Sequence, residues 1–190
     1  MEKRSYILGT AQTLFAQFGL KKVTVDDIAR QARVSKATVY KYFANKSEIF
    51  DVVVKSEADQ LLEAVEAAVA TQRRAIDKLR AHLLTRLKEV QVFVNFFRVT
   101  QESWGDYWPS IAGIRKQFMT RDRNIVKRIL DEGVISGELT CENTELAAHA
   151  LAVSLASVEY QWTTDELEIP IEDLIDTMVN MMSEGIRRRP

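Results

Sequence analysis

The sequence of 190 residues has few of the residues that interrupt or cross-link a chain: one cysteine, three prolines and seven glycines. The single cysteine, Cys141, excludes an internal disulfide and fits a reducing cytoplasm. The scarcity of proline and glycine, with 46% hydrophobic and 28% charged residues, is typical of a folded protein rich in helix formers. This composition excludes disordered and collagen-like chains.

Long hydrophobic runs are also missing. The longest uncharged stretch, 146–158, includes His149 and is shorter than the roughly 18–20 residues that a membrane span requires. The apolar start of the chain is interrupted by Gln12 and Gln17, and its large side chains follow a helical stripe, which argues against a signal peptide. We therefore expect a cytoplasmic protein with no membrane partner.

The patterns of a catalytic site are absent as well. The sequence shows no glycine-rich phosphate loop, no nucleophile with a nearby base and no cluster of metal ligands. Its two histidines, His82 and His149, lack the spacing of a metal site. We expect neither an enzyme nor a site for a metal or cofactor.

Charge is distributed unevenly along the chain. The net charge is −1, but residues 1–48 contain nine Lys and Arg against four Asp and Glu, a net charge of +5. The remainder carries 17 basic and 23 acidic residues, a net charge of −6. A basic N-terminal segment followed by an acidic remainder indicates a module that binds a polyanion.

Helical periodicity runs along nearly the whole chain, and no segment alternates as a strand would. A first helix is predicted to end at Gly19, which readily adopts the left-handed conformation. Thr24 and Ser35 are predicted N-caps of two short helices, and Asn45 is the predicted cap of a long fourth helix from about Lys46.

Further apolar stripes predict helices in the rest of the chain, the last two at about Thr144–Trp162 and Ile171–Ile186. We expect an all-α fold of about nine helices. A three-helix head for DNA binding is predicted in residues 1–46, and a larger helical body in residues 47–190.

Two short helices joined by a tight turn, the second presenting cations and hydroxyls, form a helix-turn-helix motif. The second helix of such a motif enters the major groove of double-stranded DNA, and side chains near its N-terminus reach base edges. Three residues are predicted there: Lys36, Ala37 and Thr38. The others are predicted to face phosphates or to present helix-start amides to them: Thr24, Arg33, Ser35, Tyr40, Lys41, Tyr42 and Lys46. Each alone is more often part of a solvated face, so the prediction depends on their combination.

The run from Ile7 to Phe50, ILGTAQTLFAQFGLKKVTVDDIARQARVSKATVYKYFANKSEIF, resembles the DNA-binding domain of the TetR family of transcriptional regulators almost position by position. The later ILDEGVISGEL is similar to a looser feature of that family. Family members usually have glycine in the turn where this chain has Arg33. If the turn needs a positive φ, arginine costs about 1 kcal/mol, which a phosphate contact would offset. A tolerated, exposed turn residue is the alternative.

The resemblance implies that the body forms a homodimer through a four-helix interface and binds a small effector that releases DNA. The last two helices suit the interface, since one is rich in Ala and Ser and the other has an apolar seam, although packing within one chain would also explain them. Independently, bulky side chains near a predicted helix break suggest an apolar effector pocket, with core packing as the alternative for any one of them. They are Phe93, Phe96, Phe97, Trp104, Tyr107, Trp108, Phe118, Met119 and, as a polar group, His149.

Together these features predict a DNA-binding transcriptional regulator, a repressor released from its operator by a small apolar or amphipathic ligand. The long fourth helix is the expected connection between the ligand and the head. The alternative is a TetR-like protein whose body binds a protein partner.

Overall fold

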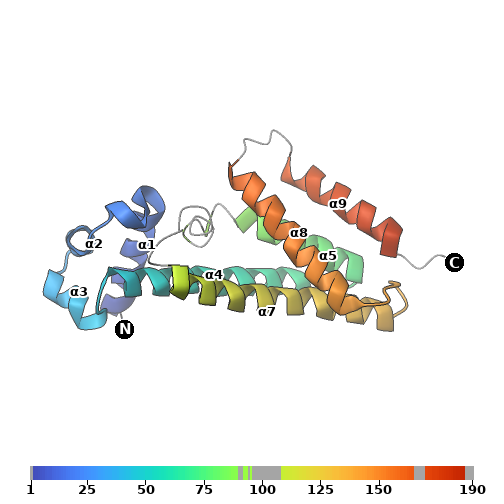
Figure 1. Ribbon diagram of the computed structural model, residues 1–190, viewed down its shortest axis with the longest axis horizontal. Helices are drawn as coiled ribbons and strands as arrows, with labels where there is room; N and C mark the ends of the chain where they lie inside the picture. The colour runs from blue at the N-terminus through green and yellow to red at the C-terminus, as the bar shows by residue number, and fades with distance from the viewer. Residues whose placement is uncertain (1, 90–91, 94, 96–107, 165–169, 187–190) are drawn as a thin grey trace. The chain divides into compact units, whose positions relative to one another are not determined.

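The computed structural model describes residues 2–89, 92, 93, 95, 108–164 and 170–186, without the side chains of residues 2, 108–110, 160–164 and 184–186. This part of the chain contains eight α-helices (Figure 1), which confirms the predicted all-α fold. They are α1 (Glu2–Lys22), α2 (Val25–Gln31), α3 (Lys36–Tyr42), α4 (Lys46–Ala70), α5 (Ala75–Glu89), α7 (Trp108–Ile135), α8 (Thr144–Thr164) and α9 (Ile171–Ile186). None of the helices described is long and apolar enough to cross a bilayer.

Contacts within the backbone divide the chain into two compact units. The head unit consists of Met1–Asp59 and Phe93–Arg115, and the body unit consists of Gln60–Val92 and Lys116–Pro190. The head unit therefore includes the first part of α4 and a second stretch from the middle of the sequence, in addition to the three helices predicted for it.

One face of α1 forms the centre of the head unit. Ile7, Ala11 and Phe15 are spaced four residues apart, and each is at most 1% exposed. The ring of Phe15 meets that of Phe50 on α4 edge to face, with centroids 5.2 Å apart, an arrangement that the ring quadrupoles favour. Regular geometry in α1 is interrupted at Gly19, where φ is 77°, at the position that the sequence predicts. Helix α2 contacts both α1 and α3.

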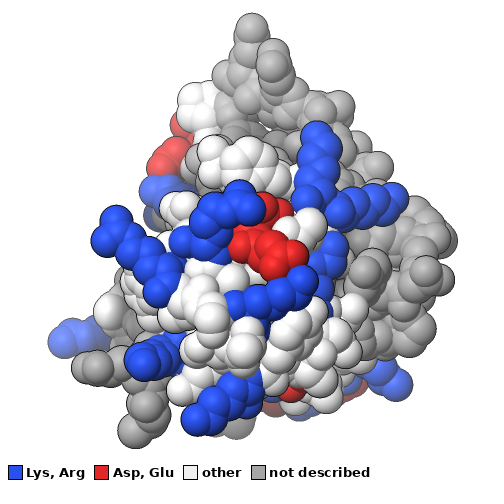
Figure 2. Space-filling view, turned by 90° about the vertical axis from the view of Figure 1, so that its left-hand side faces the viewer, with Lys and Arg blue, Asp and Glu red and all other residues white. Residues whose placement is uncertain are grey.

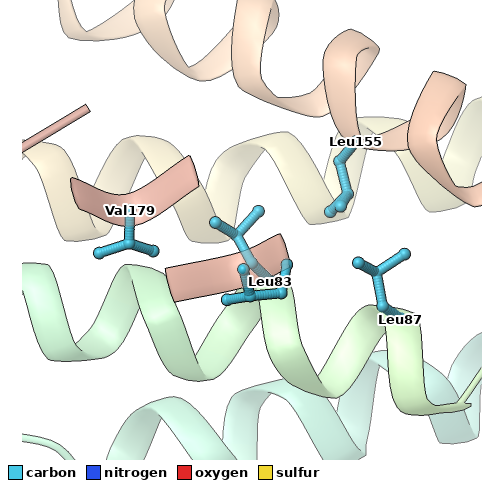
Figure 3. Close-up of a cluster of buried hydrophobic side chains, with 5 residues drawn as sticks. Leu83, Leu87, Leu155 and Val179 are labelled. Atoms are coloured by element: carbon cyan, nitrogen blue, oxygen red, sulfur yellow. The ribbon is translucent and has the colours of Figure 1, made fainter. Parts of the chain in front are cut away.

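A cluster of apolar side chains holds α5, α8 and α9 together in the body unit (Figure 3). Leu83 and Leu87 of α5 pack with Leu155 of α8 and with Ile175 and Val179 of α9. Each is at most 6% exposed, and burying a side chain of this size contributes about 1.5–3 kcal/mol. The pairs on α5 and α9 are four residues apart, which is the periodicity that predicted these helices.

A glycine near the end of α7 lets two other segments approach the helix closely. A Cβ atom at Gly133 would lie 2.5 Å from Cδ1 of Leu139 and 2.8 Å from Cβ of Ala75, well inside van der Waals contact. Gly137 then adopts a φ of 76°, and the N–H of Leu139 donates to the carbonyl of Gly133 at 2.9 Å. Gly137 thus turns the chain back after the end of α7, and Gly133 leaves the room that the returning chain needs.

Candidate nucleic-acid interface

Helix α2 begins at its predicted N-cap, Thr24, which forms a capping box with Asp27. The hydroxyl of Thr24 accepts from the N–H of Asp27 at 3.2 Å, and the Asp27 carboxylate accepts from the N–H of Thr24 at 3.0 Å. The Thr24 hydroxyl also donates to this carboxylate, and its hydrogen bond is the main cause that lowers the pKa of Asp27. Thr24 therefore fixes the start of α2, and its contact with a phosphate stays a prediction.

The turn between α2 and α3 has the hydrogen bonds of a Schellman motif. The N–H of Val34 donates to the carbonyl of Ala29 at 2.9 Å, and the N–H of Arg33 donates to that of Arg30 at 3.1 Å. Arg33 has a φ of 52° and is the one non-glycine residue with positive φ among those described. This position does require the left-handed conformation, which glycine adopts most easily. The side chain of Arg33 is exposed, and its contact with a phosphate stays a prediction.

Helix α3 presents an exposed face of predicted DNA contacts. Oγ of Ser35 caps the helix by accepting from the N–H of Thr38 at 3.1 Å, and Val39 is completely buried. Because Val39 fixes the inward side of this short helix, the residues on the other side face solvent. Lys36, Ala37, Tyr40 and Lys41 are exposed, whereas Thr38 and Tyr42 are half-buried. A short helix with an exposed basic and aromatic face has the geometry of a recognition helix.

One of these predicted base-reading residues is paired with an acid. Nζ of Lys36 donates to Oδ2 of Asp26 at 2.8 Å, joining the start of α3 to the first turn of α2. This hydrogen bond raises the pKa of Lys36. The two side chains are 50% and 55% exposed, so the pair lies on the surface of the motif. Sequence reasoning placed Lys36 correctly on the exposed face and missed its partner.

Lys46 occupies a more internal position than the sequence suggests. Its ammonium donates to the carbonyls of Leu20 at 2.8 Å and Val23 at 2.9 Å, where α1 ends after the break at Gly19. A cation at this place satisfies carbonyls that have no partner within the helix and complements the helix dipole. Its predicted phosphate contact would have to form beside these hydrogen bonds or replace them.

The side of the molecule that carries α2 and α3 is predominantly basic (Figure 2). Lysine and arginine side chains spread across this view, and a small acidic group lies among them. Such a surface attracts the phosphates of DNA irrespective of sequence, because each neutralised phosphate releases counterions. The basic segment found in the sequence is therefore presented to solvent together with α3.

A buried carboxylate connects three segments of the head unit. Glu57 of α4 is 1% exposed, and its Oε1 accepts from the amide of Gln12 on α1 at 2.9 Å and from the amide of Asn95 at 2.7 Å. The Asn95 amide also donates to the carbonyl of Gln12 at 3.1 Å. Asn95 is 2% exposed. Asn95 is thus fixed to both α1 and α4.

Four ionisable side chains meet in the core of the body unit: His82 and Arg86 of α5, Asp122 of α7 and Glu159 of α8, none more than 5% exposed. Arg86 donates to Glu159 through Nε at 2.7 Å and Nη2 at 2.6 Å. Its Nη1 lies 2.6 Å from Oδ2 of Asp122, an ion pair without the alignment of a hydrogen bond. Nε2 of His82 lies 2.8 Å from Oδ1 of Asp122. The network joins three helices.

Arg86 dominates the electrostatics of this network. Burial raises the pKa of Glu159, and Arg86 offsets only part of this rise. Burial by itself would also raise the pKa of Asp122. Arg86 and His82 outweigh this effect and hold the pKa of Asp122 far below its ordinary value. Because an ionised Asp122 can only accept, Nε2 of His82 is the donor in their hydrogen bond.

The residues predicted for an effector pocket have mixed positions. Phe93 is buried in the head unit, and Phe118 is buried in the body unit with its ring centroid 4.8 Å from the Arg86 guanidinium. Met119 is half-buried, whereas His149 is exposed on α8. The other predicted positions lie outside the described residues or side chains: Phe96, Phe97, Trp104, Tyr107 and Trp108. The pocket therefore stays a prediction.

Comparison with known proteins bears on the family. Residues 7–53 match the model for "Bacterial regulatory proteins, tetR family". The chain is 30% identical over 146 residues to the uncharacterized HTH-type transcriptional regulator YdeS of Bacillus subtilis, covering 74% of this chain and 68% of that protein. It is 25% identical over 192 residues to the fatty acid metabolism regulator protein of B. subtilis, covering 98% and 97%. The structure of the B. subtilis transcriptional regulator FadR in complex with stearoyl-CoA is similar with a TM-score of 0.77 at 23% identity, covering 97% of this chain and 100% of that one.

Proposed function

The chain belongs to the tetR family of bacterial regulatory proteins and is a DNA-binding transcriptional regulator, not an enzyme, and from this premise we propose that it is a cytoplasmic repressor released from its operator by an acyl-CoA. The small amphipathic ligand expected from the sequence is thereby narrowed to one chemical class. The full-length likeness to a fatty acid metabolism regulator supports this choice, as does the stearoyl-CoA bound to FadR.

The proposed repressor acts as a homodimer through α8 and α9. On α8, Leu146 and Val153 are 64% and 50% exposed, and on α9 Met181 is 72% exposed. His149 and Ala150 are also exposed on α8 at helical spacing between the first two, so these four residues form one exposed stripe, in which His149 is the polar side chain. Such a stripe permits close packing with a second copy. Two heads would then read half-sites about 34–36 Å apart.

The observation that carries the ligand response is the position of Asn95. The aromatic segment predicted to surround the effector begins at Phe93, and this part of the chain belongs to the head unit. Asn95 donates to the backbone of α1 and to the buried carboxylate of Glu57 on α4. Leaving a buried acceptor without its donor costs about 1–3 kcal/mol, so a ligand that displaces Asn95 disturbs the helices that support α2 and α3.

The coupling free energy between ligand binding and DNA release that a useful response requires is of the same size as the loss of this hydrogen bond. A ligand that binds the released form a hundredfold more tightly than the DNA-bound form shifts the equilibrium by about 2.7 kcal/mol. Loss of one such hydrogen bond therefore supplies most of the free energy of a useful response. No large rearrangement of the head is needed for this.

The test is a DNA-release titration with stearoyl-CoA. The duplex is the tightest one that the chain selects from a random-sequence pool, and coenzyme A and stearate are the comparison ligands. We expect release by stearoyl-CoA at much lower concentration than by either comparison ligand. If stearoyl-CoA neither binds nor changes the DNA affinity, the proposed ligand class is refuted. A promoter that overlaps the selected site should be repressed, and stimulation instead would make the protein an activator.

Asn95→Ala tests the coupling separately. Because this variant lacks the hydrogen bonds from the start, it should bind the duplex several-fold more weakly without ligand, and stearoyl-CoA should lower that affinity by a smaller factor than in the wild type. Asn124→Ala, which removes an exposed amide on α7, is the matched control and should respond as the wild type does. A wild-type response from Asn95→Ala would show that the signal does not pass through this residue.

A further inference from the structure

Asp26 is the acid of the helix-turn-helix motif whose carboxylate is bound to a predicted base-reading cation. Its Oδ2 lies 2.8 Å from Nζ of Lys36. The other two acids between residues 24 and 48 have structural roles: Asp27 completes the capping box of α2, and Glu48 accepts from the N–H of Ala44 at 2.6 Å. The side chains of Asp26 and Lys36 are both about half exposed, beside the outward face of α3.

We infer that Asp26 is a specificity-determining residue, which withholds Lys36 from the phosphates of arbitrary DNA and holds its ammonium where a base edge with a matching acceptor can meet it. Affinity for arbitrary DNA comes almost entirely from cations that neutralise phosphates. A lysine paired with aspartate adds no net charge to that attraction. The carboxylate also repels phosphates that come near it. Both effects lower binding to arbitrary sequences.

The strength of the pair makes this selection possible. An exposed ion pair changes an equilibrium by at most about fivefold, and salt weakens it further. A well-placed hydrogen-bonding contact to a base edge discriminates by about five- to 150-fold. The Lys36 ammonium has three donors, so it can keep its hydrogen bond to Asp26 and donate at the same time to a base such as guanine, which presents two acceptors in the major groove. A phosphate out of reach of the paired ammonium requires Lys36 to leave Asp26 first, so the pair weakens binding to arbitrary DNA more than binding to the selected site, and specificity rises as a difference of two affinities.

The direct test is Asp26→Asn, which keeps the shape of the side chain and removes its charge. Dissociation constants are measured over a range of salt concentrations for two duplexes. One is the tightest duplex selected by the wild type from a random pool, and the other is a scrambled duplex of the same composition. We expect the variant to bind the scrambled duplex about three- to tenfold more tightly at low salt, with a salt slope steeper by about one for each bound head. The selected duplex should change by less than about twofold.

A matched control separates this effect from a simple change in net charge. Asp59→Asn removes the same charge from an exposed ion pair on α4, in which Nζ of Lys55 lies 2.6 Å from Oδ2 of Asp59. It should change the binding of both duplexes little and by equal factors. If Asp26→Asn also tightens both duplexes equally, Asp26 acts only through net charge and the inference is wrong.

A double variant shows whether Asp26 acts through its partner. In a Lys36→Gln background, Asp26→Asn should no longer tighten binding to the scrambled duplex by more than Asp59→Asn does. Persistence of the full effect would overturn the inference, because another cation would then be responsible. Weaker binding of Asp26→Asn to both duplexes would overturn it as well, since Asp26 would then support the shape of the motif.

Discussion

Replacing Arg86 by methionine should destabilise the protein severely, although methionine is also a long side chain. The substitution leaves Asp122 and Glu159 buried together without the guanidinium that contacts both. Removing one partner of a buried ion pair typically costs about 3–5 kcal/mol, because the other charge is left uncompensated. Lost contact with the ring of Phe118 adds to this cost. For a chain of this size the expected fall in Tm is roughly 6–20 °C, at about 2–4 °C per kcal/mol.

The assay is urea unfolding at pH 7, at one fixed protein concentration because dimerisation would make stability depend on concentration. Arg80→Met is the matched control on the same helix. Arg80 also donates twice to one carboxylate, that of Asp176, but the two side chains are 40% and 47% exposed. An exposed pair of this kind contributes at most about 1 kcal/mol.

A third variant separates charge from packing. Combining Arg86→Met with Asp122→Asn and Glu159→Gln removes all three formal charges, and should recover most of the stability lost by Arg86→Met alone. Equal losses from Arg80→Met and Arg86→Met would refute the reasoning about burial. A triple variant as unstable as Arg86→Met would show that shape, not charge, accounts for the loss.

Gly133→Ala should lower the free energy of unfolding by about 1–3 kcal/mol in a denaturant titration, because the new Cβ would lie 2.5 Å from a methyl carbon of Leu139. Gly113→Ala on the same helix, with nothing within 4 Å of the added atom, should raise it by up to about 1 kcal/mol; the same sign for both would contradict this. Arg33→Gly should raise Tm slightly by relieving a φ of 52°, and should weaken operator binding in a gel-shift titration; unchanged binding would remove its phosphate role. The ionised form of Asp122, whose pKa is held below its ordinary 3.8, contributes stability that is present above pH 3.8 and lost as the pH falls further. Asp122→Asn should therefore be less stable at pH 7 but lose less stability below pH 4 in thermal melts, and an unaltered acid slope would exclude this contribution.

The helices could be predicted well because the signals that begin and end them are local. Thr24 and Ser35 cap α2 and α3 through residues three positions away, and Gly19 breaks α1 by its own backbone conformation. Which face of a helix is covered by other helices depends on residues far away in the sequence, so it cannot be predicted from local signals. Phe18 continues the apolar stripe of α1, a pattern that indicates burial, yet it is 50% exposed beside the break at Gly19.

The exposed face of α3 followed from the same local pattern, but the polar pairs did not. Lys36 meets an acid ten residues away, Asn95 meets a carbonyl 83 residues away, and Arg86 meets a carboxylate 73 residues away. Such pairings depend on how helices cross. A partial signal was present, since Arg86 lies at helical spacing from buried Leu79 and Leu83. That spacing indicates burial of the charge but does not identify its partner.

The head unit is built from two separate stretches of the chain, and this has a consequence for the design of hybrid regulators. A DNA-reading segment excised as residues 1–59 leaves behind Asn95, so the buried carboxylate of Glu57 loses one of its amide donors. Grafting that excised piece onto the C-terminal part of a relative would pair it with a foreign residue at this place. A chimaera that transplants residues 93–115 along with residues 1–59 retains the native donor. It should keep more of the affinity and specificity for the original operator.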